Sequence, residues 1–206
     1  MARLSPQLAE TASQEYPGAH VVNGFPLVEF DRAPIDRYLL RGFALAWTAD
    51  LTVIQIVDDK QYQLNGYAIF RNSDVKRWRP IPSDGFYGKA AIIHELRPEP
   101  PVGVTIVSMK EALASAGRVF PLVTIHRERT DHGACYVGKV HRTSQRAVSL
   151  ILVSHEGEWE GEQESYSLKD ITLVEFGGAY ERLLDQMAPT APTAPKPKSS
   201  PSRYKR

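Results

Sequence analysis

The sequence has little cysteine and no long apolar run. Its single cysteine among 206 residues, Cys135, cannot form an internal disulfide, which excludes the small disulfide-stabilised domains of secreted proteins. The longest apolar stretches, such as residues 147–153, are far shorter than the roughly 20 residues that cross a bilayer as a helix. The first residues carry one arginine and no apolar block, unlike a secretory signal. We therefore expect a cytoplasmic protein without a membrane partner.

Familiar catalytic and cofactor motifs are also missing. The chain contains no phosphate-binding loop, no G-x-G-x-x-G fingerprint, no H-E-x-x-H motif and no G-x-S-x-G motif. The glycine-containing stretch 131–138 precedes a predicted strand, so it does not place a helix N-terminus against a phosphate. These absences favour a protein that is not an enzyme and uses no cofactor.

A basic excess is missing from the body of the chain. The net charge is +1, but residues 188–206 contain five basic residues and no acidic one. Without this segment, 20 basic residues remain against 24 acidic residues. A general polyanion binder is expected to be basic in its folded part, so this distribution argues against that class. The proline-rich composition of 188–206 predicts a disordered basic tail.

Two nearly identical octets point to an internal repeat. "FPLVEFDR" spans 25–32 and "FPLVTIHR" spans 120–127, at an offset of 95. Beyond one insertion the offset is 96, and matched positions continue: Gly42 with Gly138, Thr48 with Ser144, Ile54 with Leu150, Ile56 with Leu152, Val57 with Val153, Asp74 with Asp170, and Val75 with Ile171. The alternative is chance similarity. The repeat predicts two units, 20–82 and 115–177, and since two copies are too few for a solenoid, each is expected to bury its own core.

Each unit is predicted to contain five short strands. The second strand has a glycine at its centre, Gly42 or Gly138, where a bend or bulge is expected. The third, 51–57 or 147–153, is continuously apolar, as a buried strand is. Asp74 or its counterpart is expected to accept backbone N–H groups in the turn before the last strand. So many short strands in so few residues predict a small curled barrel whose sheet closes on itself.

Helices are predicted around these units. Residues 108–118 form one, with Ser108 as N-cap, Glu111 completing a capping box and Gly117 as a left-handed stop. Residues 88–96 are predicted to form another. The expected order is an N-terminal helix at 1–19, the first barrel at 20–82, a linker with helices at 83–114, the second barrel at 115–177, a C-terminal helix at 178–187 and the disordered tail at 188–206.

The chain resembles the Sm-like, or more broadly SH3-like, small-barrel superfamily, including uncharacterised bacterial proteins of this type. The resemblance rests on the strand–turn–strand segment 166–176, on its counterpart in the first unit and on the "NGY" at 65–67. The resemblance implies a mainly β fold with flanking helices, built from two tandem five-stranded Sm-like or SH3-like small barrels. It also implies association through barrel edges, between the two units or between molecules, and a bias toward RNA or protein partners.

One candidate nucleic-acid site lies in "RNSDVKRWRP", residues 71–80. Basic side chains with an aromatic between them suit contacts to phosphates and stacking on a base. The alternative is a strand edge with solvated charges and the tryptophan packed inward. The candidate residues are Arg71, Lys76, Arg77, Trp78 and Arg79.

An acidic stretch forms a second candidate site, for a cation or a basic partner. The alternative is a hairpin whose charges prevent pairing with a neighbouring strand. A third possibility is that the basic tail of the same or a second molecule lies against it. The residues are Glu156, Glu158, Glu160, Glu162 and Glu164.

Histidine and cysteine cluster in the second unit, at His126, His132, Cys135 and His141. These are zinc-ligand types, but they lack the close spacing of structural zinc sites, so no metal site is predicted. Cys135 with His126 or His132 as a base lacks an orienting acid and an oxyanion hole, so no catalytic residue is assigned. We expect this cysteine to pack as a small apolar residue.

The sequence thus predicts a non-enzymatic binding or adaptor protein of tandem Sm-like barrels. Its partner is expected to be another protein or a second copy of the chain. The first alternative is an RNA-binding protein that uses the first barrel and the basic tail. The second is a metal-binding or cysteine-dependent enzyme.

Overall fold

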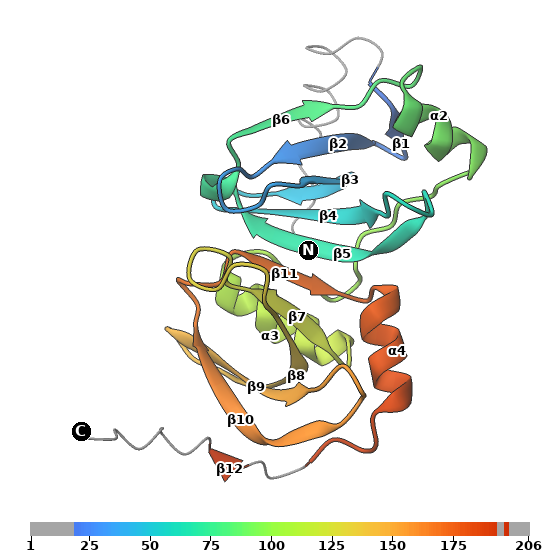
Figure 1. The fold of residues 1–206 in the computed structure, drawn as a ribbon. Coiled ribbons are helices and arrows are strands. Elements are labelled where there is room, and N and C mark those ends of the chain that lie inside the picture. The colour runs from blue at the N-terminus through green and yellow to red at the C-terminus, as the bar shows by residue number, and fades with distance from the viewer. Residues whose placement is uncertain (1–18, 193–195, 198–206) are drawn as a thin grey trace.

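The computed structural model describes residues 19–192 and 196–197 (Figure 1). The expected N-terminal helix therefore lies outside the described residues except for Ala19. The described chain is mainly β, with one open sheet of 12 strands and three α-helices. None of the helices in the described ranges is long and apolar enough to cross a membrane.

The first half of the sheet contains six strands. β2 to β5 are antiparallel neighbours in chain order, the short β1 lies beside β2, and β6 pairs with β2. The six strands are β1 (Val21–Val22), β2 (Phe25–Asp31), β3 (Leu39–Trp47), β4 (Leu51–Val57), β5 (Leu64–Arg71) and β6 (Arg77–Pro80).

The first five strands of the second half are arranged in the same order as β2 to β6 of the first half. β7 to β10 are antiparallel neighbours, and β11 pairs with β7 as β6 pairs with β2. The strands are β7 (Val123–His126), β8 (Cys135–Thr143), β9 (Ala147–Val153), β10 (Trp159–Ser167), β11 (Leu173–Phe176) and β12 (Lys196–Pro197). β12 belongs to the predicted tail and pairs in parallel with β10.

The predicted bend at the central glycine is present in both halves. A side chain at Gly42 would collide with the carbonyl of Gln55, and one at Gly138 with the carbonyl of Ile151. A register shift follows each glycine, between Ala44 and Ala46 in β3 and at the matching place in β8. Only glycine permits such a close approach of two backbones, which explains why the residue recurs at both positions.

The two halves are joined by strand pairing. β11 pairs with β5 on its other side, with Leu173 opposite Phe70 and Phe176 opposite Tyr67. These two strands lie side by side at the middle of the molecule in Figure 1. The prediction that each unit closes its own sheet is wrong, because the pairing is open and runs through this junction from one half to the other.

The largest apolar cluster extends across the junction. It includes Leu27 and Ile69 from the first half, Ile125 and Val174 from the second, and Leu113 from a helix. The prediction that each unit buries a separate core is therefore wrong for this cluster. Two smaller clusters lie almost wholly within one half each. Burial of a common apolar interior stabilises the two halves as one body.

Three helices flank the sheet: α2 (Phe86–Ile93), α3 (Met109–Val119) and α4 (Ala179–Met187). The Ser108 cap is confirmed, since its side chain accepts a hydrogen bond from the backbone N–H of Glu111. The predicted stop at Gly117 is wrong, because α3 continues to Val119. Gly117 instead allows the helix to contact Val140 of β8 closely.

The turn before each last strand is present, and in the first half it is the 3-10 helix η1 (Asn72–Asp74). The expected role of Asp74 is wrong. Its buried carboxylate accepts hydrogen bonds from the side chains of Arg129 and Ser73, not from backbone N–H groups. This aspartate therefore links the first half to the second.

Candidate binding groove

The predicted nucleic-acid residues do not form one basic face. Arg77 and Arg79 are largely exposed on β6, but each pairs with an acid of β2, at 2.9 Å from Asp31 and 2.8 Å from Glu29. Trp78 points the other way and packs against Trp47, with ring centroids 5.9 Å apart. The arginine charges are thus offset by neighbouring carboxylates, which weakens attraction to phosphates.

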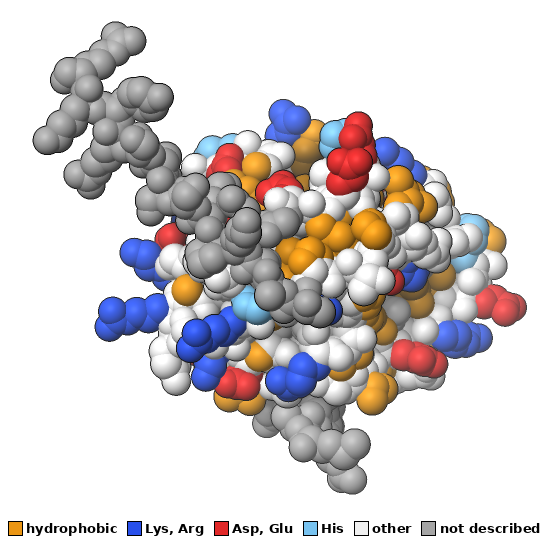
Figure 2. All heavy atoms as spheres, turned by 90° about the horizontal axis from the view of Figure 1, so that it is seen from below, with side chains coloured by type: hydrophobic (Ala, Val, Ile, Leu, Met, Phe, Trp, Pro, Cys, Tyr) orange, Lys and Arg blue, Asp and Glu red, His pale blue; other side chains and the backbone are white. Residues whose placement is uncertain are grey.

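The remaining two residues of that set have different positions. Arg71 donates hydrogen bonds to the carbonyls of Leu168 and Ile171, at 2.7 and 3.3 Å, so its guanidinium contacts the second half. Lys76 is exposed. On the face drawn in Figure 2, basic and acidic side chains of the described residues are interspersed around a more apolar centre. A surface that binds nucleic acid usually gathers its basic side chains on one face, which neither the scattered candidate residues nor the mixed charges of this face do.

The acidic residues lie on the hairpin of β9 and β10. Glu156, Glu158 and Glu160 are exposed, and Glu164 accepts a hydrogen bond from the Tyr166 hydroxyl at 2.9 Å. The backbone of Glu162 pairs with Lys196 of β12, so part of the basic tail runs along this strand. Among the described residues, no group of three or more His, Cys, Asp or Glu side chains is arranged to bind a metal.

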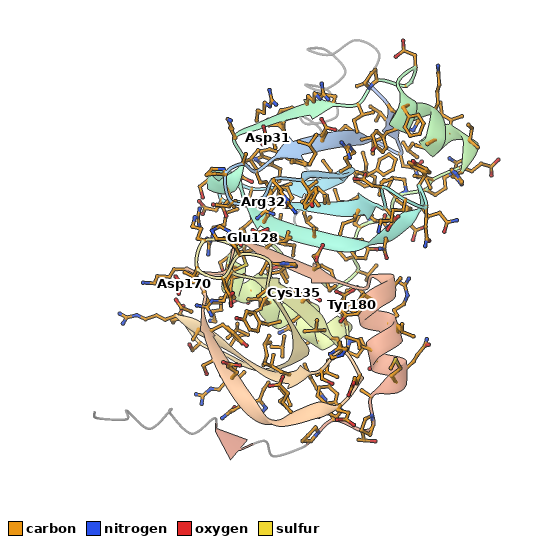
Figure 3. The ribbon with its side chains drawn as sticks, viewed as in Figure 1. Asp31, Arg32, Glu128, Cys135, Asp170 and Tyr180 are labelled. Carbon is orange, nitrogen blue, oxygen red and sulfur yellow. The ribbon has the colours of Figure 1, made fainter. Side chains whose placement is uncertain are left out.

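A buried ion pair joins the two halves. Arg32, which follows β2, is fully buried and donates to both carboxylate oxygens of Glu128, at 3.1 and 2.5 Å (Figure 3). It also donates to the carbonyl of Thr172 at 3.3 Å. Sequence reasoning missed this pair, since nothing local links residues 96 positions apart.

Two hollows of about 680 and 180 Å³ lie at this junction. Residues 34–40 of the first half and 132–135 of the second line the larger one. Asn65, Tyr180 and Glu181 line part of the smaller one. His126 and Glu175, together with the Cys135 thiol, line both. We call the two hollows together the junction groove, and its shared residues the groove floor.

Strand register explains how the floor residues meet. His126 of β7 lies directly opposite Cys135 of β8. Glu175 of β11 is two positions along from the partner of His126, and side chains at this diagonal reach each other across a sheet. The His126 Nε2 and Glu175 Oε2 atoms are 2.8 Å apart. Three adjacent strands thus place an acid, an imidazole and a thiol in a row.

A second carboxylate lies beside the floor. Glu181 is almost fully buried at the start of α4, where one oxygen accepts from the Gly178 backbone N–H at 3.0 Å. The other accepts from the Thr124 hydroxyl at 2.5 Å. The carboxylate therefore caps the helix and fixes α4 against β7.

Nearby carboxylates shift the pKa values of the two titratable groups of the floor, His126 and Cys135. Burial alone would lower the pKa of His126, but the hydrogen bond that its ring N–H donates to Glu175 and the charges of Glu175 and Glu128 raise it above 6.5. Partial burial raises the pKa of Cys135, and the charges of Glu175 and Glu181 raise it further. The thiol stays protonated near neutral pH, which does not favour attack on an electrophile.

The histidine and cysteine candidates are only partly brought together. His126, His132 and Cys135 all line the larger hollow, whereas His141 is exposed further along β8. Glu175 supplies an acid that orients His126, a partner that sequence reasoning did not find. The signal was present in the matched spacing of the two units, which aligns β11 with β6, but the pairing of β11 with both halves was not foreseen.

Comparison of the chain with protein-family models, curated proteins and solved structures finds no match.

Proposed function

We propose that this protein is a non-enzymatic binding or adaptor protein made of two Sm-like modules, and that it binds its partner in the junction groove. Two features support the modular origin. The five principal strands follow the same order in each half, and the glycine bend and register shift occur at matching places in β3 and β8.

The observation that carries the proposal is the composite lining of the groove. Residues 34–40 come from the first half and residues 132–135 from the second, so the groove exists only where the halves meet. The buried pair of Arg32 and Glu128 fixes this meeting point. A pre-formed hollow in which apolar side chains and polar groups converge is the usual location of a binding site.

A pull-down with the tagged full-length chain tests this function. Native lysate is divided into nuclease-treated and untreated portions, and each is probed with the wild-type chain and an Ala134→Trp variant. Ala134 lines the larger hollow, so the indole is expected to fill it. Val102→Trp is the matched control, since Val102 is 87% exposed and does not line the groove.

A protein partner is expected to be captured in both portions by the wild type and the control, and lost with Ala134→Trp. Capture that disappears on nuclease treatment favours the RNA-binding alternative. Equal capture by Ala134→Trp and the wild type would exclude the groove as the binding site.

Association with a second copy is a further candidate function. The outer strand β6 favours it, because it pairs with β2 alone among the described residues and so leaves an edge for a second copy, as β5 offers its edge to β11 within one chain. Light scattering of the full-length chain over a range of concentrations tests it. A mass that remains that of one chain throughout argues against it.

A further inference from the structure

Carboxylates outnumber cations in and directly behind the junction groove. Asp36, Glu128 and Glu175 line the larger hollow, and Glu175 recurs with Glu181 in the smaller one. Arg32, which lies behind the groove, neutralises the charge of Glu128. Arg37 adds one positive charge in the lining of the larger hollow. Four carboxylates against two arginines leave the groove negative while no more than one of its two histidines, His126 and His132, carries a proton.

The walls of the groove suit the apolar stem of a long basic side chain. Ile35, Leu40 and Leu173 line the larger hollow, and Tyr38 stands at its wall with 66% of its surface exposed. The guanidinium of Arg37 already lies over the Tyr38 ring, 4.8 Å from its centroid. The ring therefore accepts a guanidinium in this setting, as aromatic faces do.

The groove is open along its floor. The Cys135 thiol is exposed, and the side chains of His126 and Glu175 are 21% and 28% exposed. Each hollow has an exposed tyrosine in its lining, Tyr38 in the larger hollow and Tyr180 in the smaller one. A small molecule is usually enclosed by its site, whereas two hollows that share an exposed floor suit an extended chain segment.

We infer that the junction groove binds a basic segment of a partner protein, with one arginine or lysine side chain placed between Tyr38 and the carboxylate of Glu175. The inference rests on the proposed function, to which it adds the chemistry of the partner. It differs from the acidic hairpin at 156–164, where charge is abundant but none of the residues lines either hollow of the junction groove.

Two blocked pentapeptides test the inference by titration calorimetry with the full-length chain. One is acetyl-Gly-Ala-Arg-Ala-Gly-amide, and the other has citrulline, an uncharged isostere, in place of arginine. The arginine peptide is expected to bind about tenfold or more tightly than the citrulline peptide, as a charge-assisted hydrogen bond predicts. Glu175→Gln and Tyr38→Ala are each expected to remove most of this difference.

The matched control is Glu156→Gln, which removes the same charge from the exposed hairpin. It is expected to leave the affinity unchanged. Asp36→Asn provides a second groove variant that does not disturb the His126 pair, should Glu175→Gln destabilise the fold. Thermal unfolding of each variant establishes that it is folded.

Three outcomes overturn the inference: equal affinity for the two peptides, an equal loss with Glu156→Gln and Glu175→Gln, or binding of free butylguanidine as tightly as the arginine peptide. The last outcome assigns the groove to a small cation. If the peptides fail while Ala134→Trp still abolishes partner capture, the basic segment is wrong and the binding groove stands.

Discussion

Strands β6 and β11 occupy corresponding places in the two halves but have opposite character. β6 pairs with β2 alone among the described residues, and its two arginines are exposed beside acids of β2. β11 lies between β5 and β7, and its residues Leu173, Val174 and Phe176 are buried. A central strand packed on both faces requires apolar residues, whereas an outer strand tolerates charge and proline. Position in the sheet thus explains a basic stretch that on its own suggests a nucleic-acid site.

The arginines that follow β2 and β7 show the same asymmetry. Arg32 lies 5.8 Å from the Phe70 ring, and Arg127 lies 5.7 Å from the Tyr166 ring. Among the described residues, Arg32 has the carboxylate of Asp36 at 3.8 Å within its own half and that of Glu128 at 2.5 Å in the second half, whereas no carboxylate lies within ion-pair distance of Arg127. We therefore expect the contact between the halves, more than the strand order within each half, to determine how much each arginine stabilises the fold.

Replacing Arg32 is the largest test of this comparison. Arg32→Met leaves the Glu128 carboxylate nearly buried without its partner, which is expected to lower the free energy of unfolding by about 3–5 kcal/mol. The corresponding Arg127→Met removes a cation–ring contact and is expected to cost about 1 kcal/mol or less. Urea unfolding of both variants measures the two values. Equal losses would show that the junction adds nothing to the role of the arginine.

Substitutions at the two bend glycines test whether the bends in β3 and β8 are equivalent. Gly42→Ala and Gly138→Ala each force a methyl group against a backbone carbonyl of the next strand. Each is expected to lower the free energy of unfolding by about 1–3 kcal/mol, as overpacking does. Gly133 has a positive φ, and nothing lies within 4 Å of a carbon added there. Gly133→Ala therefore measures the cost of backbone strain without a steric collision, for comparison with the other two variants. A large effect in one half only contradicts equivalent bends.

Local signals in the sequence were sufficient for the third strand of each half and for the start of α3. The third strands begin and end where their apolar runs do, at Leu51–Val57 and Ala147–Val153, because a buried strand is bounded by polar turns. The cap at Ser108 was predictable from its spacing to Glu111. The end of α3 was not, because the close contact of Gly117 with Val140 is tertiary.

The groove was much less accessible to sequence reasoning. Its floor depends on β11 pairing with both β5 and β7, a register that no local pattern specifies. His126 and Cys135 were candidates by residue type, but Glu175, which orients the histidine, lies 49 positions from it along the chain. The Arg32 pair is likewise invisible locally. Long-range pairing, rather than propensity, brings the residues of the candidate site together.

The helix caps give a smaller test. α3 is capped by the Ser108 hydroxyl, and α2 has no side-chain cap. Ser108→Ala is expected to lower the free energy of unfolding by about 1 kcal/mol, because the Glu111 N–H loses its acceptor. Gly85→Ser, at the cap of α2, adds an acceptor there and tests whether α2 depends on a cap in the same way. Urea unfolding of both variants gives the comparison, and no loss for Ser108→Ala contradicts it.

The smallest expected effect is on the pH dependence of stability, to which a histidine in each half contributes with opposite sign. Burial lowers the pKa of His20 in the first half below 6.5, whereas Glu175 and Glu128 outweigh burial and raise the pKa of His126 in the second half above 6.5. His126 therefore contributes stability that is complete below pH 6.5 and is lost as pH rises through its folded pKa. The folded state disfavours protonated His20, so its contribution is lost as pH falls below 6.5.

Urea unfolding of the wild type, His20→Gln and His126→Gln from about pH 5 to about pH 8 measures both contributions. Relative to the wild type, His126→Gln is expected to lose its deficit as pH rises above 6.5, and His20→Gln to gain an advantage as pH falls below that value. Glu175→Gln is expected to reproduce the His126→Gln profile above 6.5, since it removes the acceptor that raises the pKa. A His126→Gln difference that does not change with pH would show that the carboxylates of the groove do not act on the histidine, and would also weaken the case for a cationic partner there.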